Sequence, residues 1–168
     1  STRYETLFPY TTLFRSGGIY IALGSNLGDR AAHIHDALAE LQSDGQVRVV
    51  RCSALHETEP VGGPPGQGRF LNAVAEIDTE LPPRELLDRL LSIESAHGRE
   101  RKVPNGARTL DLDLLIYRDQ KIDEPELVVP HPRMWQRNFV LTPLEEICTP
   151  ARFNELRQFS HQPIGSTA

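Results

Sequence analysis

The stretch "RTLDLDLLIY" (residues 108–117) places two aspartates, Asp111 and Asp113, in a run that otherwise reads as a buried β-strand. Side chains of a strand alternate between its two faces, so both carboxylates point the same way, with Cα atoms about 6.5–7 Å apart. Aspartate is a poor strand former, and two neighbouring like charges repel each other. We therefore expect a cation, or several hydrogen-bond donors, to bind over this pair.

Size and composition fit one globular domain. The chain has 168 residues, of which 39% are hydrophobic, and 18 Lys and Arg against 23 Asp and Glu give a net charge of -5. This balance argues against non-specific binding to nucleic acid, which needs a basic surface. No apolar run or signal peptide indicates a membrane, so we expect a cytoplasmic protein. The lack of a long exposed apolar stripe favours a monomer.

The first residues differ in character from the rest. "TLFPYTTLFRS" (residues 6–16) matches one translation of a common sequencing adapter. We therefore expect residues 1–16 to be an artefactual, disordered extension, and residues 17–168 to form a single domain. The alternative is a genuine N-terminal extension.

Periodicity predicts the order β-α-β-β-α-β. The predicted strands are residues 19–26, residues 45–58, residues 70–81 and the strand that carries the two aspartates. Helices are expected over residues 29–41 and from Pro82 toward Gly98. This α+β order matches the ferredoxin-like plan, an antiparallel sheet with two helices on one face and its other face free for a ligand. A hairpin at residues 117–129 and a C-terminal helical segment should follow.

Two irregular segments rich in proline and glycine interrupt these elements, at residues 59–68 and 99–108. The second is basic and leads directly into the aspartate pair. Arginine presents a planar fork that suits phosphate, and two carboxylates can bridge two divalent ions, for which Mg²⁺ is the natural candidate. The combination predicts a site for phosphate and metal. The alternative is an ordinary solvated sheet face.

Other residues could complete such a site. Phe70 and Asn72 share one strand face, where an aromatic ring and an amide could recognise a planar heterocycle; otherwise they are a core ring and a surface amide. His131 and Arg137 are close enough in sequence to reach the same phosphates if their segment is helical, although His131 could instead cap a helix. "GSNLG" (residues 24–28) lacks the Gly-Lys-Ser/Thr ending of a phosphate loop, and no serine hydrolase or zinc protease motif is present.

Five segments, taken together and in this order, resemble the 6-hydroxymethyl-7,8-dihydropterin pyrophosphokinase family of folate biosynthesis. They are "IYIALGSNLGDR", "FLNAVAEIDTEL", "GRERK", "ARTLDLDLLIY" and "VPHPRMWQRNFVLTPLEEI". The resemblance runs over about residues 19–147. It implies transfer of the β,γ-diphosphate of ATP to the hydroxymethyl group of the pterin, with release of AMP, by residues 17–168 acting as one pyrophosphokinase domain.

The resemblance also implies roles for individual residues. Asp111 and Asp113 would hold two Mg²⁺ ions and, with Arg99 and Arg108, form the catalytic set. The residues expected to contact ATP are Glu94, Arg101, Lys102, Leu114, His131 and Arg137. The residues expected to contact the pterin are Thr58, Glu59, Val61, Phe70, Asn72 and Phe139. The chain departs from the best-known members at Pro104 and Asn105, where those members carry a tryptophan, and at Val61, where leucine is commoner.

Two other functions remain open at this point. A nucleotide-sugar transferase can hold a metal and a diphosphate with an Asp-x-Asp pair, but it needs no slot for a bicyclic ring. A ferredoxin-like regulatory module could bind a small ligand on its open face while the aspartates are merely solvated. Replacing Asp111 with alanine should cost the regulatory module nothing, whereas the kinase hypothesis predicts a large loss of turnover with the fold intact.

Overall fold

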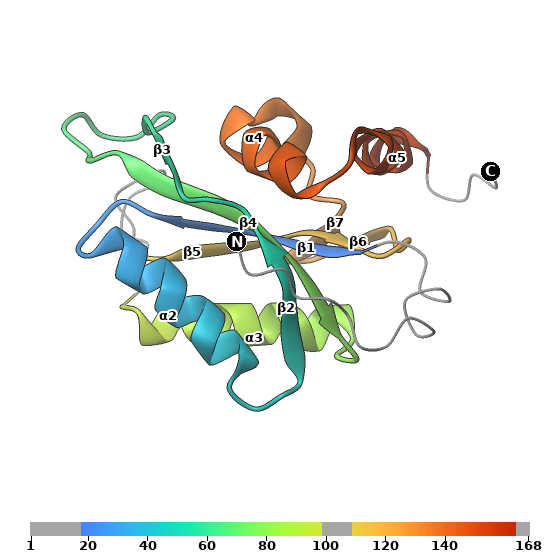
Figure 1. The fold of residues 1–168 in the computed structure, drawn as a ribbon, viewed down its shortest axis with the longest axis horizontal. Helices are drawn as coiled ribbons and strands as arrows, with labels where there is room; N and C mark the ends of the chain where they lie inside the picture. Colours follow the sequence, from blue (N-terminus) through green and yellow to red (C-terminus); the bar gives the residue numbers. More distant parts are fainter. Residues whose placement is uncertain (1–17, 99–108, 164–168) are drawn as a thin grey trace.

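The computed structural model describes residues 18–98 and 109–163. Along the chain the elements are β1 (Ile19–Ser25), α2 (Arg30–Gln42), β2 (Val47–Cys52), β3 (His56–Thr58), β4 (Phe70–Thr79), α3 (Pro83–Ala96), β5 (Asp111–Tyr117), β6 (Ile122–Glu124), β7 (Leu127–Val129), the 3-10 turn η1 (Met134–Gln136), α4 (Asn138–Ile147) and α5 (Pro150–His161) (Figure 1). None of the helices in these described ranges is long and apolar enough to cross a membrane. The predicted extension at residues 1–16 lies outside the described residues.

The main sheet is antiparallel and has the order β2-β4-β1-β5, with the short β3 also paired to β4. The predicted α+β class, with helices packed on an antiparallel sheet, is therefore confirmed. The prediction of one strand over residues 45–58 is wrong, because the chain leaves the sheet between β2 and β3. There Ser53 takes over the pairing: its backbone N–H donates to the carbonyl oxygen of Val74 (2.9 Å), and its hydroxyl accepts from the N–H of Val74 (3.0 Å).

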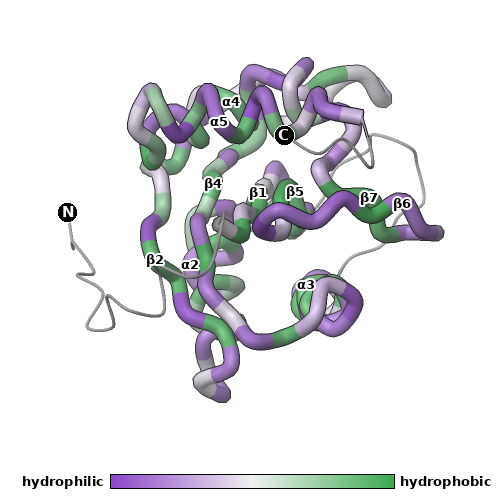
Figure 2. Tube along the Cα trace, turned by 90° about the vertical axis from the view of Figure 1, so that its right-hand side faces the viewer, coloured by the Kyte–Doolittle hydropathy of each residue, from purple (hydrophilic) through white to green (hydrophobic). Residues whose placement is uncertain are grey.

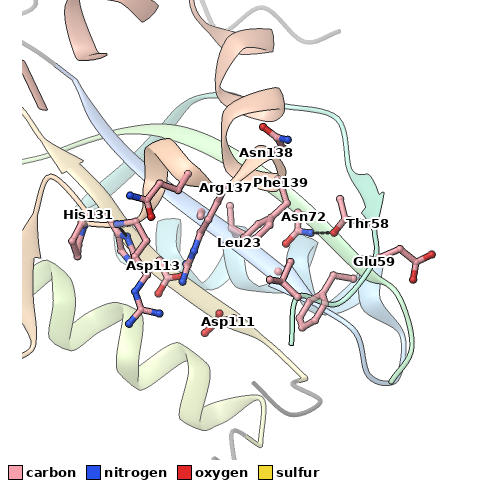
Figure 3. A pocket seen from close by; sticks show the side chains of 18 residues that line it. Leu23, Thr58, Glu59, Asn72, Asp111, Asp113, His131, Arg137, Asn138 and Phe139 are labelled. Atoms are coloured by element: carbon pink, nitrogen blue, oxygen red, sulfur yellow. Dashed lines mark hydrogen bonds between the residues drawn. The ribbon is translucent and has the colours of Figure 1, made fainter. Parts of the chain in front are cut away.

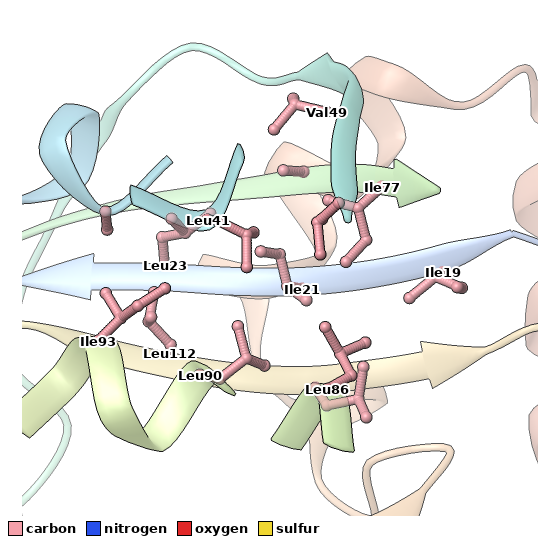
Figure 4. Close-up of a cluster of buried hydrophobic side chains, with 14 of the residues drawn as sticks. Ile19, Ile21, Leu23, Leu41, Val49, Ile77, Leu86, Leu90, Ile93 and Leu112 are labelled. Carbon is pink, nitrogen blue, oxygen red and sulfur yellow. The ribbon is translucent and has the colours of Figure 1, made fainter. Parts of the chain in front are cut away.

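Helices α2 and α3 cover one face of the sheet. The side chain of Asp29 caps α2 by accepting from the N–H of Ala32 (3.1 Å), and Pro83 occupies the first turn of α3, where its missing N–H is harmless. Figure 4 shows the core between these layers, in which aliphatic side chains of β1 and β5 meet those of the two helices. The buried set on this face includes Ile19, Ile21, Leu23, Leu41, Leu86, Leu90, Ile93 and Leu112.

Helices α4 and α5 lie across the sheet from α3 (Figure 2). They cover a second apolar cluster that contains Tyr20, Val74, Ile116, Val140, Leu144, Phe153 and Leu156. The expectation that this face is free therefore holds only for the end that carries Asp111 and Asp113. Residue size along β1 accounts for the difference between the covered part and the open part of this face. On this face β1 presents the large Tyr20 beneath the helices and then the small Ala22 and Gly24 beyond them.

Candidate active site

The floor of the candidate site is formed by two small residues of β1, Ala22 and Gly24, which lie beside the two aspartates of β5. Strand pairing sets Gly24 between Asn72 of β4 and Asp111 of β5, and sets Ala22 between Val74 and Asp113. A Cβ atom at position 24 would lie 2.9 Å from the Oδ1 of Asn72, so any side chain there would push this amide out of its position. Glycine therefore keeps the space between the amide and the carboxylates open.

A cavity of about 860 Å³ opens over this floor (Figure 3). One wall is formed by β3 and the segment after it, and the opposite wall runs from His131 through η1 into the start of α4. The cavity is large enough for a drug-sized ligand, and its lining combines aromatic, acidic, basic and amide groups.

The end of the cavity near β3 suits a planar, hydrogen-bonding ring. Asn72 is only 8% exposed, and its Nδ2 donates to the hydroxyl of Thr58 (Figure 3). This bond fixes the amide so that Oδ1, which lies toward Gly24, can accept a hydrogen bond from a ligand. The rings of Phe70 and Phe139 also line the cavity, one from β4 and one from α4.

The other end of the cavity is positively charged. Arg133 and Arg137 line it, and neither has a carboxylate partner among the residues that the structure describes. The guanidinium of Arg137 lies 5.5 Å from the ring centre of Phe139, so the cation is held close to the aromatic wall. Unpaired guanidinium groups in a cavity favour an anionic ligand, above all a phosphate.

His131 is fixed between these arginines as a neutral hydrogen-bond donor. Its backbone N–H donates to the carbonyl oxygen of Leu115 (2.7 Å), and its Nδ1 accepts from the backbone N–H of Arg133 (3.2 Å). Burial, followed by the charges of Arg137 and Arg133, lowers the pKa of His131 to about 4. At neutral pH the single ring proton is therefore on Nε2, where it can be donated to a ligand oxygen.

The aspartate pair fits a metal that takes part of its coordination shell from a substrate. Asp111 and Asp113 are partly exposed and line the same cavity, as their spacing predicted. Within residues 18–98 and 109–163, no three or more His, Cys, Asp or Glu side chains are grouped to hold a metal ion. Mg²⁺ commonly binds one or two carboxylates and completes its shell with water and phosphate oxygens, so these donors suit it.

Glu94 supports the pair from behind. This residue of α3 is only 1% exposed, and its Oε1 accepts a hydrogen bond from the backbone N–H of Leu112 (2.7 Å). Because Leu112 lies between Asp111 and Asp113, the buried carboxylate holds the backbone that carries both of them. α3 thereby fixes the edge strand at the point where the site needs to be rigid.

The sequence model of the 7,8-dihydro-6-hydroxymethylpterin-pyrophosphokinase (HPPK) family matches residues 20–149. The chain belongs to this family. Similar proteins named 2-amino-4-hydroxy-6-hydroxymethyldihydropteridine pyrophosphokinase occur in Bacillus subtilis, with 49% identity over 129 residues (77% of each chain), and in Pseudomonas aeruginosa, with 43% identity over 139 residues (83% of this chain and 85% of the relative). The Haemophilus influenzae protein of the same name is 43% identical over 130 residues (77% of this chain and 81% of the relative).

Most of the residues that the HPPK resemblance indicated come together around the cavity. Those that line it are Thr58, Glu59, Val61, Phe70, Asn72, Asp111, Asp113, His131, Arg137 and Phe139. Arg99, Arg101, Lys102 and Arg108 lie outside the described residues. Glu94 and Leu114 are buried away from the cavity lining, and the side chain of Leu114 packs in the core beneath the sheet. Any contact between Leu114 and a nucleotide is therefore through its backbone.

Glu59 and Val61 reach the cavity from the irregular segment after β3. Glu59 forms an ion pair with Arg69 (2.7 Å), so the two ends of the segment at residues 59–68 are held together. Val61 is 73% exposed, and its side chain is available to a ligand rather than packed in the core. Both residues therefore present side chains to the cavity from outside the sheet.

Sequence reasoning missed eight residues that line the cavity: Ala22, Leu23, Gly24, Ala73, Pro132, Arg133, Gln136 and Asn138. The predicted strand at residues 19–26 includes Gly24, but sequence could not identify it as a site residue, because its closeness to Asn72 depends on strand pairing between distant segments. Arg133 lies two residues from His131 in "PHPRMWQR", and this spacing was a signal that could have identified it.

Proposed function

We propose that this protein transfers the β,γ-diphosphate of ATP to the hydroxymethyl group of 6-hydroxymethyl-7,8-dihydropterin and releases AMP, a step in folate biosynthesis. The proposal rests on one observation. A single cavity is lined by the pair Asp111 and Asp113, by the cationic segment that carries Arg133 and Arg137, and by the amide of Asn72 beside aromatic rings. The names of the relatives describe this pyrophosphokinase activity. A nucleotide-sugar transferase has no need for the aromatic end.

The pterin occupies the end of the cavity near β3. Phe70 and Phe139 stack on its two faces, while the Oδ1 of Asn72 accepts from its ring N–H groups. Thr58 keeps that amide from rotating, so the site distinguishes acceptor from donor on the ring edge. Glu59 and Val61 close the outer side of the ring.

ATP occupies the cationic end, with its phosphates between the arginines and the aspartates. His131 donates a hydrogen bond from Nε2, and Arg137 neutralises negative charge on the phosphates. Glu94, Leu114, Arg101 and Lys102 contribute to the nucleotide site, and Arg99 and Arg108 cover the transferring phosphates. Asp111 and Asp113 would hold two Mg²⁺ ions, which when bound would supply positive charge at the phosphates and lower the pKa of a coordinated hydroxyl group.

Catalysis then depends on orientation and electrostatics. The hydroxymethyl oxygen attacks the β-phosphorus, the bond from that phosphorus to the α,β-bridging oxygen breaks, and AMP leaves with the electron pair. The proton of the hydroxyl group is released. The rigid floor aligns the two substrates, the positive charges stabilise the transferring group, and closure by the segment at residues 59–68 excludes water as a competing acceptor.

We also propose the fold topology, the domain extent and the oligomeric state of the protein. The strand order β2-β4-β1-β5, with antiparallel neighbours, supports the ferredoxin-like arrangement. Residues 17–168 act as a single pyrophosphokinase domain, working as a cytoplasmic monomer. Sedimentation of the purified chain tests the oligomeric state.

The direct test is product analysis after the purified chain is mixed with ATP, Mg²⁺ and 6-hydroxymethyl-7,8-dihydropterin. We expect AMP and a diphosphorylated pterin in equal amounts, because one diphosphate group is transferred per turnover. Omission of the pterin is the control, and it should leave ATP intact. Pterin-independent ADP or AMP from folded protein would contradict the proposal.

The pterin end makes a separate prediction. Asn72→Ala and Phe139→Ala should each raise the KM for the pterin by roughly ten- to 100-fold, since each removes a hydrogen bond or a stacking surface. The KM for ATP should change little. Steady-state kinetics with each substrate varied in turn measures the difference, and Phe159→Ala on α5 is a matched aromatic control outside the cavity. An equal rise in both KM values would place these residues elsewhere.

A further inference from the structure

A second hollow of about 350 Å³ lies behind the cationic segment, between η1 and α5. It is lined by Trp135 and Gln136 of η1, by Arg157 and His161 of α5, and by residues 130–132. His131 and Gln136 border both this hollow and the main cavity. None of the proposed catalytic steps uses the hollow.

Helix α5 turns one basic face toward the hollow. Arg157 and His161 are four residues apart, so they lie one above the other on the helix. The guanidinium of Arg157 lies 5.3 Å from the ring centre of Trp135 and 5.1 Å from that of Phe153. Arg157 has no carboxylate partner in the part of the chain that the structure describes, and Glu155 of the same helix pairs instead with Arg152. The guanidinium is held in place by stacking and keeps its donors available.

The available hydrogen-bond donors of this hollow are those of the Arg157 guanidinium rather than those of His161. The Nδ1 of His161 lies 2.8 Å from the carbonyl oxygen of Arg157, which can only accept, so the proton on Nδ1 is already used within α5. The Nε1 of Trp135 is buried and has no partner among the described residues. No acidic side chain is among the described residues that line the hollow. A buried donor without an acceptor is costly, and such groups often mark a site for a ligand or water.

We propose that this hollow is a second anion site that binds a phosphate-sized oxyanion, either free or as the phosphoryl group of a nucleotide. The stacked guanidinium of Arg157 is its main anchor, with the amide of Gln136 opposite. The whole chain carries a net charge of -5, so a hollow lined by an unpaired cation is a local exception that attracts anions. A bound anion lies against the segment that carries His131 but outside the cavity proposed for ATP.

The only tryptophan of the chain, Trp135, makes the test direct. Its fluorescence should change saturably when inorganic phosphate is added at constant ionic strength. Arg157→Met keeps most of the stacking side chain but removes the charge, and it should weaken the apparent affinity at least about tenfold, the range expected for a charged hydrogen bond. Pterin-dependent turnover should be unchanged. Arg84→Met, on α3 across the sheet, is the matched control and should bind phosphate like the parent protein.

Two further experiments determine where the anion binds and which anion it is. Arg137→Met alters only the main cavity, so it should leave the phosphate response of Trp135 intact. AMP that binds more tightly than phosphate, with the same dependence on Arg157, identifies a nucleotide as the occupant, whereas equal affinities identify free phosphate. The proposal is overturned if phosphate gives no saturable change, if Arg157→Met binds as tightly as the parent protein, or if Arg137→Met abolishes the response.

Discussion

Replacing Asp111 or Asp113 with alanine should abolish diphosphate transfer and leave the fold intact. Each change removes one of the two charged oxygen donors on the cavity floor, so the positive charge that stabilises the transferring phosphates can no longer be held there. We expect kcat/KM to fall at least about a thousandfold, which corresponds to roughly 4 kcal/mol of transition-state stabilisation. AMP release in the presence of the pterin measures the loss.

The aspartate variants need controls for charge and for folding. Asp123→Ala removes an exposed aspartate of the β6 hairpin, away from the cavity, and should leave turnover unchanged. The free energy of unfolding of the Asp111 and Asp113 variants should stay within about 1 kcal/mol of the parent value, because both side chains are partly exposed and outside the core clusters. Calorimetric titration with Mg²⁺ and a non-hydrolysable ATP analogue should show loss of metal-dependent binding. Full activity in both variants would make the two-metal proposal wrong.

Local signals predicted much of the fold. The strand predicted over residues 70–81 put Phe70 and Asn72 on one face, and both line the cavity in the structure. The helix predicted over residues 29–41 is α2, which begins at Arg30 with Asp29 as its cap. These features depend on neighbours in the sequence, and periods of two or 3.6 residues report them directly.

The features that sequence missed depend on long-range packing. The sequence indicated a helical C-terminal segment, but it could not show that α4 would pack over β1 and β4 and cover part of the sheet face. The break between β2 and β3 depends on how Ser53 pairs with Val74 across the sheet. The candidate site shows the same contrast between local signals and long-range packing. The spacing of the carboxylates indicated the acidic pair, whereas the contact of Gly24 with Asn72 could be known only from the register of the paired strands.

Glu94 provides the second large effect that we expect. Glu94→Ala leaves the N–H of Leu112 without its acceptor and opens a void beneath the edge strand. The loss of a buried acceptor and of its packing should lower the free energy of unfolding by about 3 kcal/mol. Activity should also fall, by at least roughly 100-fold, because the backbone between the two aspartates is no longer fixed. Urea denaturation and steady-state kinetics measure the two losses.

A second variant, Glu94→Gln, distinguishes two roles of this side chain: holding the backbone of Leu112 in position, and direct contact with ATP. Its side-chain oxygen can still accept from Leu112, so we expect it to recover most of the stability and most of the activity. Glu85→Ala, an exposed carboxylate near the start of the same helix, should change neither property by much. If Glu94→Gln recovered the stability while the KM for ATP stayed high, the carboxylate itself would contact the nucleotide, as the family resemblance implies. Recovery of both properties means that Glu94 acts through the strand, and that α3 controls the geometry of the acidic pair from the opposite side of the sheet.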